Sequence, residues 1–271
     1  MGHDDWAGKT VLVLGLGDTG LSCVRFLAEA GARLRGADTR AAPPALGAVL
    51  EAAPGIRVDL GAFRPEILAG VDAVASSPGI ALREPVVREA LARGIEVVGD
   101  VEIFGREVAR SSPGARVIGI TGTNGKSTVT AMAGEMARAA GLSTVVAGNI
   151  GLPVLDALRE ARAAGMPQAW VIELSSYQLE TTASLALDAA AMLNLSQDHL
   201  DRYDSMAEYA AAKARIFRRC GTRVVNRDDP WSLGMAAGRT ASFGLGAPAG
   251  VPGARAPRPA RGAGARRGLL R

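Results

Sequence analysis

The sequence is poor in cysteine, histidine and aromatic residues. Its 271 residues include two cysteines, Cys23 and Cys220, two histidines, and only 4% aromatic residues. Two cysteines without motif spacing provide no disulfide framework and are typical of a reducing cytosol. Residues 1–10 lack the apolar core of a signal peptide, and no apolar run reaches membrane-spanning length. We therefore expect a cytoplasmic protein without a membrane partner.

The chain also lacks an excess of basic residues outside its C-terminal segment. The formal net charge is +4, but residues 247–271 hold six arginines and no acid, so the other 246 residues carry about 4 − 6 = −2. The sequence therefore predicts no nucleic acid partner. The tail consists almost entirely of Gly, Ala, Pro and Arg, and we expect residues 247–271 to be disordered, because this composition buries no core.

Lysine is scarcer than arginine by a wide margin. Of the 31 basic residues only Lys9, Lys126 and Lys213 are lysines. A guanidinium differs from an ammonium in shape and keeps its proton in proteins. A lysine retained in such an arginine-rich chain therefore indicates a position that needs an amine.

Short apolar runs alternate with helical segments along most of the chain, which predicts parallel α/β sheets. A Ser-Ser-Pro-Gly stretch at 111–114 divides two such alternations. We expect one domain over residues 1–112 and a second over 113–246. The expected strands are Val11–Gly15, Arg33–Ala37, Ile56–Leu60, Ala73–Ser76, Ile95–Val98, Arg116–Ile120, Thr144–Ala147, Ala169–Leu174, Ala189–Leu193, Thr222–Val225 and Thr240–Phe243. The expected helices include Leu21–Ala30, Pro85–Arg93, Val101–Ala109, Ser127–Ala140 and Met206–Arg219.

The first glycine-rich motif is Gly15–Gly20, which fits G-x-G-x-x-G between a strand and a helix. Such glycines let the backbone approach a phosphate at a helix N-terminus, as in Rossmann-like domains. Asp38 follows the next strand, where its carboxylate can accept hydrogen bonds from a ribose or a base. By itself this motif favours a nicotinamide or flavin dinucleotide, although a UDP-sugar fits the same layout. The turn Ser76–Ile80 follows another strand, where it is either part of the ligand site or an ordinary strand-ending turn.

The second glycine-rich motif, Gly119–Thr128, is more specific. An apolar strand leads into Thr-Gly-Thr-Asn-Gly-Lys-Ser at the start of a helix. Backbone N–H groups of such a loop hold phosphates, Lys126 reaches the β and γ oxygens, and Ser127 binds Mg²⁺. The motif departs from the strict phosphate-loop pattern, because Ile120 stands at the first glycine position. We interpret it as an ATP site.

Three further residues are candidates for a metal or catalytic role. Glu173 ends an apolar strand, His199 lies in the polar segment Asn194–Tyr203, and Lys213 lies in the middle of a helical segment. Each also has an ordinary interpretation: a solvated glutamate, a surface histidine, and a lysine that extends its amine into solvent.

Taken together, these motifs resemble the Mur ligases of peptidoglycan synthesis. The resemblance covers about residues 8–245 and includes the phosphate loop, Gly148–Gly151, Glu173–Glu180 and Asp198–Tyr203. The N-terminal motifs resemble those of the members that add D-glutamate to UDP-N-acetylmuramoyl-L-alanine. The resemblance implies a Rossmann-like substrate domain, a P-loop-type α/β ATPase domain, ATP and Mg²⁺ as cofactors, and reaction through an acyl phosphate. We also expect a monomer.

The resemblance also implies roles for single residues. The UDP-substrate site would consist of Gly17, Asp18, Thr19, Asp38, Thr39, Arg40, Ser77, Gly79 and Asn149. ATP would be bound by Gly122, Thr123, Asn124, Gly125, Lys126, Ser127 and Thr128. Lys126, Glu173, His199 and Lys213 would be catalytic, and Mg²⁺ would be held by Ser127, Glu173, His199 and Lys213 as its carbamate. A lysine carbamate supplies oxygen ligands that suit Mg²⁺, and it forms from a neutral amine that burial favours.

One departure from the family pattern affects the expected activity. The family's C-terminal Rossmann-like domain and the end of its ATPase domain have no counterpart in this sequence, so we expect the second domain to be incomplete. Three alternatives follow: a ligase, a fragment that binds UDP-substrate and ATP without catalysis, or a sister Mur ligase that adds another amino acid. We expect no D-glutamate ligation by the chain alone. A nicotinamide oxidoreductase is disfavoured, because hydride transfer needs no ATP site.

Overall fold

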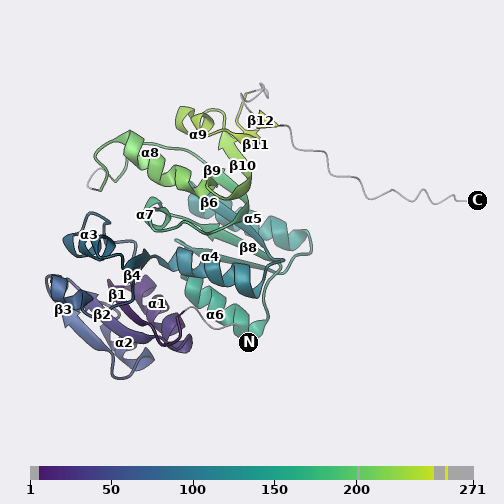
Figure 1. Cartoon of the computed structure of the whole chain (residues 1–271). Helices are drawn as coiled ribbons and strands as arrows, with labels where there is room; N and C mark the ends of the chain where they lie inside the picture. Colours follow the sequence, from purple (N-terminus) through teal and green to yellow (C-terminus); the bar gives the residue numbers. More distant parts are fainter. Residues whose placement is uncertain (1–5, 200–201, 247–253, 256–271) are drawn as a thin grey trace, which may run out of the picture.

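The computed structural model describes residues 6–199, 202–246 and 254–255. Two parallel β-sheets, each covered by helices, form the two parts of the molecule in Figure 1. The N-terminal residues build the lower sheet in this view, and the residues after Arg116 build the upper one. The expected fold class, two α/β units with parallel sheets, is confirmed.

The first sheet has the strand order β3-β2-β1-β4-β5. Its strands are β1 (Thr10–Leu14), β2 (Arg33–Asp38), β3 (Arg57–Leu60), β4 (Ala73–Ser76) and β5 (Glu96–Val98). The chain leaves β1 for β2 on one side and later returns to β4 on the other. This reversal places the carboxyl ends of β1 and β4 at a topological switch point, where open α/β sheets bind ligands.

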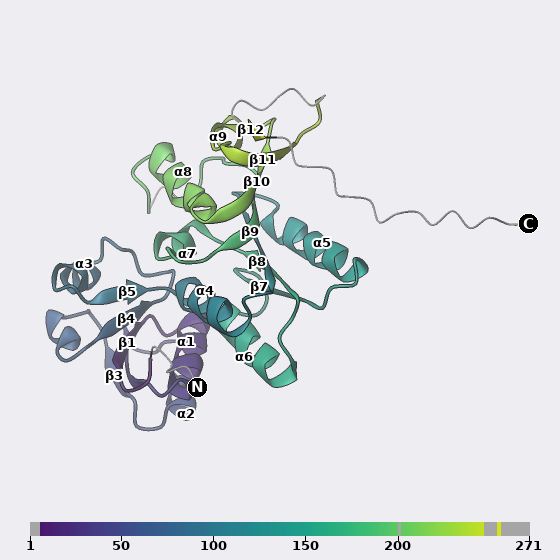
Figure 2. The ribbon, with the colours of Figure 1, turned by 45° about the vertical axis from the view of Figure 1, so that its right-hand side comes forward.

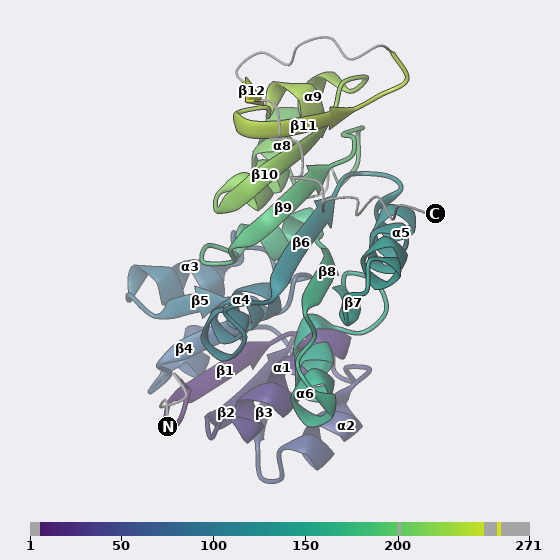
Figure 3. The same ribbon diagram turned by 90° about the vertical axis from the view of Figure 1, so that its right-hand side faces the viewer.

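The second sheet has the order β12-β11-β10-β9-β6-β8-β7, and its ladders are also parallel. Its strands are β6 (Arg116–Thr121), β7 (Thr144–Gly148), β8 (Ala169–Glu173), β9 (Leu187–Met192), β10 (Cys220–Asn226), β11 (Gly238–Phe243) and β12 (Ala254–Arg255). Strand β6 lies between β9 and β8, so the loop that follows it emerges within the sheet. Figure 3 shows β9, β6 and β8 side by side, with α5 to one side of them.

Helices connect the strands in both sheets. They are α1 (Asp18–Glu29), α2 (Leu46–Ala52), α3 (Pro85–Ala92), α4 (Asp100–Ser111), α5 (Lys126–Ala139), α6 (Val154–Ala164), α7 (Ser176–Glu180), α8 (Met206–Ala214) and α9 (Pro230–Gly234), with short 3₁₀ turns η1 (Pro65–Leu68) and η2 (Arg215–Phe217). In Figure 2, α5 lies on one side of the second sheet, and α7 and α8 lie on the other. None of the helices in the described residues combines the length and apolarity needed to cross a membrane.

Two sequence predictions need correction. The helix expected over Met206–Arg219 ends as an α-helix at Ala214 and tightens into η2. The tail expected to be disordered over 247–271 contains Ala254–Arg255, which pairs with Gly238 and Arg239 of β11 as the parallel strand β12. The prediction is wrong for these two residues, and the rest of this segment lies outside the described residues.

The two sheets share one hydrophobic core through α1, α4 and α6. A single cluster of buried apolar side chains includes Val13 of β1, Phe26 of α1, Phe104 of α4 and Trp170 of β8. The rings of Phe104 and Trp170 meet edge to face at 5.1 Å. Such contacts hold the loops of one sheet in a fixed position relative to those of the other.

Candidate functional site

A cavity of about 520 Å³ lies at the carboxyl ends of the first sheet, against the start of the second part. Loops after β1, β2, β4 and β7 contribute to it. Its lining includes every residue predicted for the UDP-substrate site: Gly17, Asp18, Thr19, Asp38, Thr39, Arg40, Ser77, Gly79 and Asn149. The structure thus brings together nine residues that are spread over more than 130 positions of sequence.

The glycines of the first loop have distinct geometric reasons. Gly15 adopts a left-handed φ of 83°, and the Oγ of Ser77 donates to its carbonyl at 2.7 Å. A Cβ on Gly20 would lie 1.9 Å from the same carbonyl, so only glycine lets α1 start this close to β1. A Cβ on Gly17 would meet no atom within 4 Å, which leaves the middle of the loop open to the cavity. This division of roles is the one expected of a dinucleotide-type loop.

Asp38 organises this loop from the end of β2. Its oxygens accept the backbone N–H of Leu16 at 2.7 Å, the backbone N–H of Arg40 at 2.9 Å, and two bonds from the Arg40 guanidinium. The hydrogen bonds from Arg40 are the main cause that lowers the pKa of Asp38 to about 2. Each oxygen of Asp38 already accepts two hydrogen bonds in this structure, and its expected role toward a ribose or a base stays a prediction. Both residues line the cavity, and the Arg40 side chain is half-exposed whereas that of Asp38 is buried.

The second glycine-rich loop joins β6 to α5. Gly125 caps the helix with a left-handed φ of 76°, and Lys126 Nζ donates to the Thr123 carbonyl at 3.0 Å. Asn194, which follows β9, braces the loop: its Oδ1 accepts from Asn124 N at 2.8 Å, and its Nδ2 donates to Asn124 O at 3.0 Å. Asn124, Gly125, Ser127 and Thr128 are exposed. The loop therefore presents the N-terminus of a 14-residue helix, a natural site for phosphate.

Glu173 lies at the end of β8 and is buried, with 1% of its surface exposed. Its Oε1 accepts a hydrogen bond from Asn149 Nδ2 at 2.8 Å, while its Oε2 finds no hydrogen-bond partner in the described part of the chain. The interpretation of Glu173 as a solvated strand-end residue is therefore wrong. A buried carboxylate oxygen without a donor suits a cation such as Mg²⁺, which prefers oxygen ligands.

Lys213 lies on α8 with only 2% of its surface exposed, so the interpretation as a surface lysine is also wrong. Its Nζ donates to the Gly122 carbonyl at 2.8 Å and lies 4.9 Å from the ring centroid of Tyr209. Burial lowers its pKa to about 7, and the nearby Lys126 acts in the same direction. A substantial neutral fraction near neutral pH is the state that carbamylation requires.

His199 has a left-handed backbone conformation, with φ of 55°. Its ring stands 4.8 Å from that of Tyr177 and 5.9 Å from that of Tyr209, and its side chain is 39% exposed. Such a conformation is uncommon outside glycine and is often found at functional sites. A role in metal binding stays a prediction.

The predicted metal set is assembled from different kinds of ligand. In the parts of the chain that the structure describes, no three His, Cys, Asp or Glu side chains group closely enough to hold a metal ion. The predicted set of Ser127, Glu173, His199 and Lys213 contains only two such side chains, so it depends on a hydroxyl and on carbamylation of Lys213. Sequence reasoning assigned no role to Gln178, which lines the cavity, or to Asn194, which bonds to the phosphate loop.

Two family models match the chain in the order of its two sheets. Residues 9–99 match the model described as Mur ligase MurD-like, N-terminal domain, and residues 120–250 match the Mur ligase middle domain. The chain belongs to the Mur ligase family. Both matched regions contribute residues to the cavity and loops described above.

Curated relatives give the same result. UDP-N-acetylmuramoylalanine--D-glutamate ligase from Thiobacillus denitrificans is 56% identical over 253 residues, covering 88% of this chain and 53% of the relative. The ligase of the same name from Methylobacillus flagellatus is 56% identical over 242 residues, covering 89% and 52%. The chain therefore spans about half the length of these relatives.

Solved structures of other Mur ligases share the fold. UDP-N-acetylmuramate:L-alanyl-gamma-D-glutamyl-meso-diaminopimelate ligase from Neisseria meningitides superposes with a TM-score of 0.53 at 20% identity, covering 84% of this chain and 74% of that one. UDP-N-acetylmuramate-alanine ligase from Thermotoga maritima gives 0.51 at 19% identity, covering 88% and 52%. At this identity the likeness concerns the fold alone.

Proposed function

We propose that this chain binds UDP-N-acetylmuramoyl-L-alanine and ATP as part of a ligase that adds D-glutamate in peptidoglycan precursor synthesis. The observation that carries the proposal is the cavity that gathers all nine predicted substrate residues and reaches Asn149. Asn149 in turn donates to Glu173, which connects the substrate cavity to the expected metal side of the site. The D-glutamate ligases among the relatives, at 56% identity, support the choice of substrates.

The proposed reaction has two steps. A carboxylate oxygen of the UDP-linked alanine attacks the γ-phosphorus of ATP, so a P–O bond forms, the bond to the ADP oxygen breaks, and an acyl phosphate results. The amine of D-glutamate then attacks the acyl carbon, the C–O bond to phosphate breaks, and the amine loses a proton to solvent. Phosphoryl transfer of this kind depends mainly on positioning and electrostatics.

The residues of this chain would supply those two effects. Lys126 and the amides at the start of α5 would bind the phosphates, while Arg40 and the Gly15–Gly20 loop would hold the diphosphate of the substrate. Glu173, Ser127, His199 and carbamylated Lys213 would hold Mg²⁺, which neutralises charge on the transferring phosphoryl group. The unpartnered Oε2 of Glu173 fits that assignment.

Calorimetric titration separates this proposal from the alternative of a nicotinamide oxidoreductase. We expect saturable binding of UDP-N-acetylmuramoyl-L-alanine and no binding of NAD, because Arg40 and Ser77 lie at the cavity beside an ATP loop. Saturable NAD binding without a response to the UDP compound would overturn the proposal. Because we expect no ligation by this chain alone, phosphate release that depends on both the UDP compound and D-glutamate, and not on L-glutamate, would show that the chain suffices for the complete reaction.

A further inference from the structure

A single arginine bridges the substrate cavity and the segment that carries His199. We propose that Arg202 is a positioning residue that fixes the Ser77–Ile80 turn of the cavity relative to His199. The proposal rests on the proposed function, since the turn is assigned to the UDP-substrate site. Arg202 itself does not line the cavity of that site, so its effect on substrate would be indirect.

The side chain of Arg202 reaches from the second part of the molecule to the first. Its Nη1 donates to the Pro78 carbonyl at 3.2 Å, and its Nη2 donates to the Ile80 carbonyl at 3.3 Å. These carbonyls belong to the turn that the Ile80 N–H closes by donating to Ser77 O at 3.0 Å. The hydroxyl of Ser77 then continues the connection to Gly15 of the first glycine loop.

The main chain of Arg202 makes the other half of the bridge. The backbone N–H groups of Arg202 and Tyr203 both donate to the His199 carbonyl, at 3.0 and 3.1 Å. These two bonds connect the Arg202 and Tyr203 backbone directly to His199, which has a left-handed φ. A shift of His199 on binding metal or nucleotide would therefore move Arg202, and with it the carbonyls of the substrate turn.

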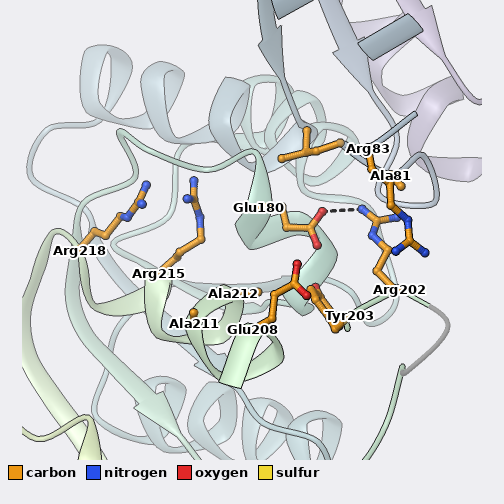
Figure 4. Close-up of a pocket in the computed structure, with 11 residues that line it drawn as sticks. Ala81, Arg83, Glu180, Arg202, Tyr203, Glu208, Ala211, Ala212, Arg215 and Arg218 are labelled. Atoms are coloured by element: carbon orange, nitrogen blue, oxygen red, sulfur yellow. Dashed lines mark hydrogen bonds and ion pairs between the residues drawn. The ribbon is translucent and has the colours of Figure 1, made fainter. Parts of the chain in front are cut away.

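Helix α7 holds the guanidinium in place. Glu180 accepts from Arg202 Nη2 at 2.6 Å, and the Arg202 guanidinium lies 4.4 Å from the ring centroid of Tyr177. The two charged side chains are 9% and 14% exposed, and Figure 4 shows their ion pair in the wall of a cavity of about 360 Å³. Breaking such a shielded pair from one side leaves an uncompensated charge, so the position of the arginine is strongly specified.

The chemistry of the contacts requires arginine. A planar guanidinium offers several donors in fixed directions, and here two nitrogens serve two carbonyls and a carboxylate while the plane lies near an aromatic ring. A lysine at this position keeps the charge and can keep the pair with Glu180, but its three donors spread from one nitrogen and do not reproduce the geometry in which Nη1 and Nη2 meet the two carbonyls. Arg202→Lys therefore removes the bridge while leaving the cation.

The test compares three variants of the full chain. For Arg202→Lys we expect the Kd for UDP-N-acetylmuramoyl-L-alanine to rise about 10-fold, the effect of one net hydrogen bond, while the Kd for Mg·ATP changes less than about twofold. Glu180→Gln should act in the same direction but less strongly, because the carbonyl contacts remain. Asp204→Asn is the matched control: it breaks an exposed pair with Arg83, 3.7 Å apart across the same junction, and should change neither Kd.

Hydrogen exchange without ligand gives an independent readout. We expect the amides of residues 77–84 to exchange faster in Arg202→Lys, while those of the phosphate loop keep their wild-type rates. Unchanged exchange at the turn would overturn the proposal, as would equal weakening of both ligands with faster exchange throughout, which indicates general destabilisation. If the wild-type chain does not bind the UDP compound, the proposed function fails, but the exchange experiment still decides whether Arg202 fixes the turn.

Discussion

The two glycine-rich loops have the same topology and differ in what holds them. Each follows a strand inside a parallel sheet and opens a helix, α1 after β1 and α5 after β6. The first loop is braced by a carboxylate, Asp38, and its cation is Arg40 from the next strand end. The second loop is braced by an amide, Asn194, and carries its own cation, Lys126.

The two loops also differ in the charge at the start of the helix that follows each of them. Helix α1 begins with an acid, Asp18, whereas α5 has no acid in its first turn. The second loop therefore offers a lysine and a helix N-terminus whose first turn carries no carboxylate, which suits the β and γ phosphates of a triphosphate. The first loop offers a more balanced set of charges, which suits a diphosphate attached to groups that form hydrogen bonds. The spacing of the glycines does not distinguish a diphosphate site from a triphosphate site. The residues that bond to each loop, Asp38 and Asn194, do differ between the two.

The sharpest way to break this comparison is to remove the second loop's cation. We expect Lys126→Ala to weaken Mg·ATP binding by about 100-fold, because charge-assisted bonds to phosphate are among the strongest polar contacts. Binding of the UDP compound should stay within about twofold, because Lys126 does not line the substrate cavity. Calorimetry with both ligands measures this, and Lys9→Ala is the matched lysine control. Equal loss of both ligands would mean that the two loops do not act independently.

The parts of this comparison that the sequence predicted are local ones. The strand before each loop, the loop itself and the helix after it appear in consecutive residues, so apolar runs and glycines identify them. The scarcity of lysine also indicated that Lys213 needs an amine, and its burial agrees with this.

The bracing contacts could not be predicted in the same way. Asn194 bonds to a residue 70 positions earlier, and its pairing depends on β9 lying next to β6. Helix α7 has only five residues, too few for a periodic pattern, and its Ser175–Gln178 capping box was the one local signal for it. Asp38 was predicted at the right place, but its role depends on Arg40 and Leu16, whose positions only the fold reveals.

A second prediction exchanges the brace of the first loop. Asp38→Asn replaces two acceptor oxygens by one acceptor and one donor, so the N–H groups of Leu16 and Arg40 lose part of their partners. We expect the UDP compound to bind about 10-fold more weakly and the free energy of unfolding to fall by about 1 to 3 kcal/mol. Mg·ATP binding should not change. Calorimetry and denaturant unfolding measure these effects. Unchanged affinity for the UDP compound would show that Arg40 does not need its bonds to the Asp38 carboxylate in order to bind this ligand.

The pH dependence of this brace has a definite sign. Because the pKa of Asp38 is lowered from 3.8 to about 2, the stability it contributes is fully present above pH 3.8 and is lost as the pH falls through about 2. Between pH 5 and 8 the wild-type chain should therefore show no change in stability from this group. The difference in stability between the wild type and Asp38→Asn should stay constant over that range, and a difference that shrinks by pH 5 would contradict the assignment.

The smallest expected effect comes from the brace of the second loop. Asn194→Ala removes the two side-chain bonds to Asn124 but keeps the bond from Thr123 N to the Asn194 carbonyl, at 2.9 Å. Because that backbone contact still holds the loop near β9, we expect Mg·ATP to bind only about 3- to 5-fold more weakly, less than one full hydrogen bond of typical strength. Asn194→Asp sharpens the test, since it keeps an acceptor for Asn124 N but adds a negative charge beside the phosphates, so its loss should exceed that of the alanine variant. If Asn194→Asp bound Mg·ATP better than Asn194→Ala, the brace would matter more than the local charge, and the electrostatic contrast between the two loops would be wrong.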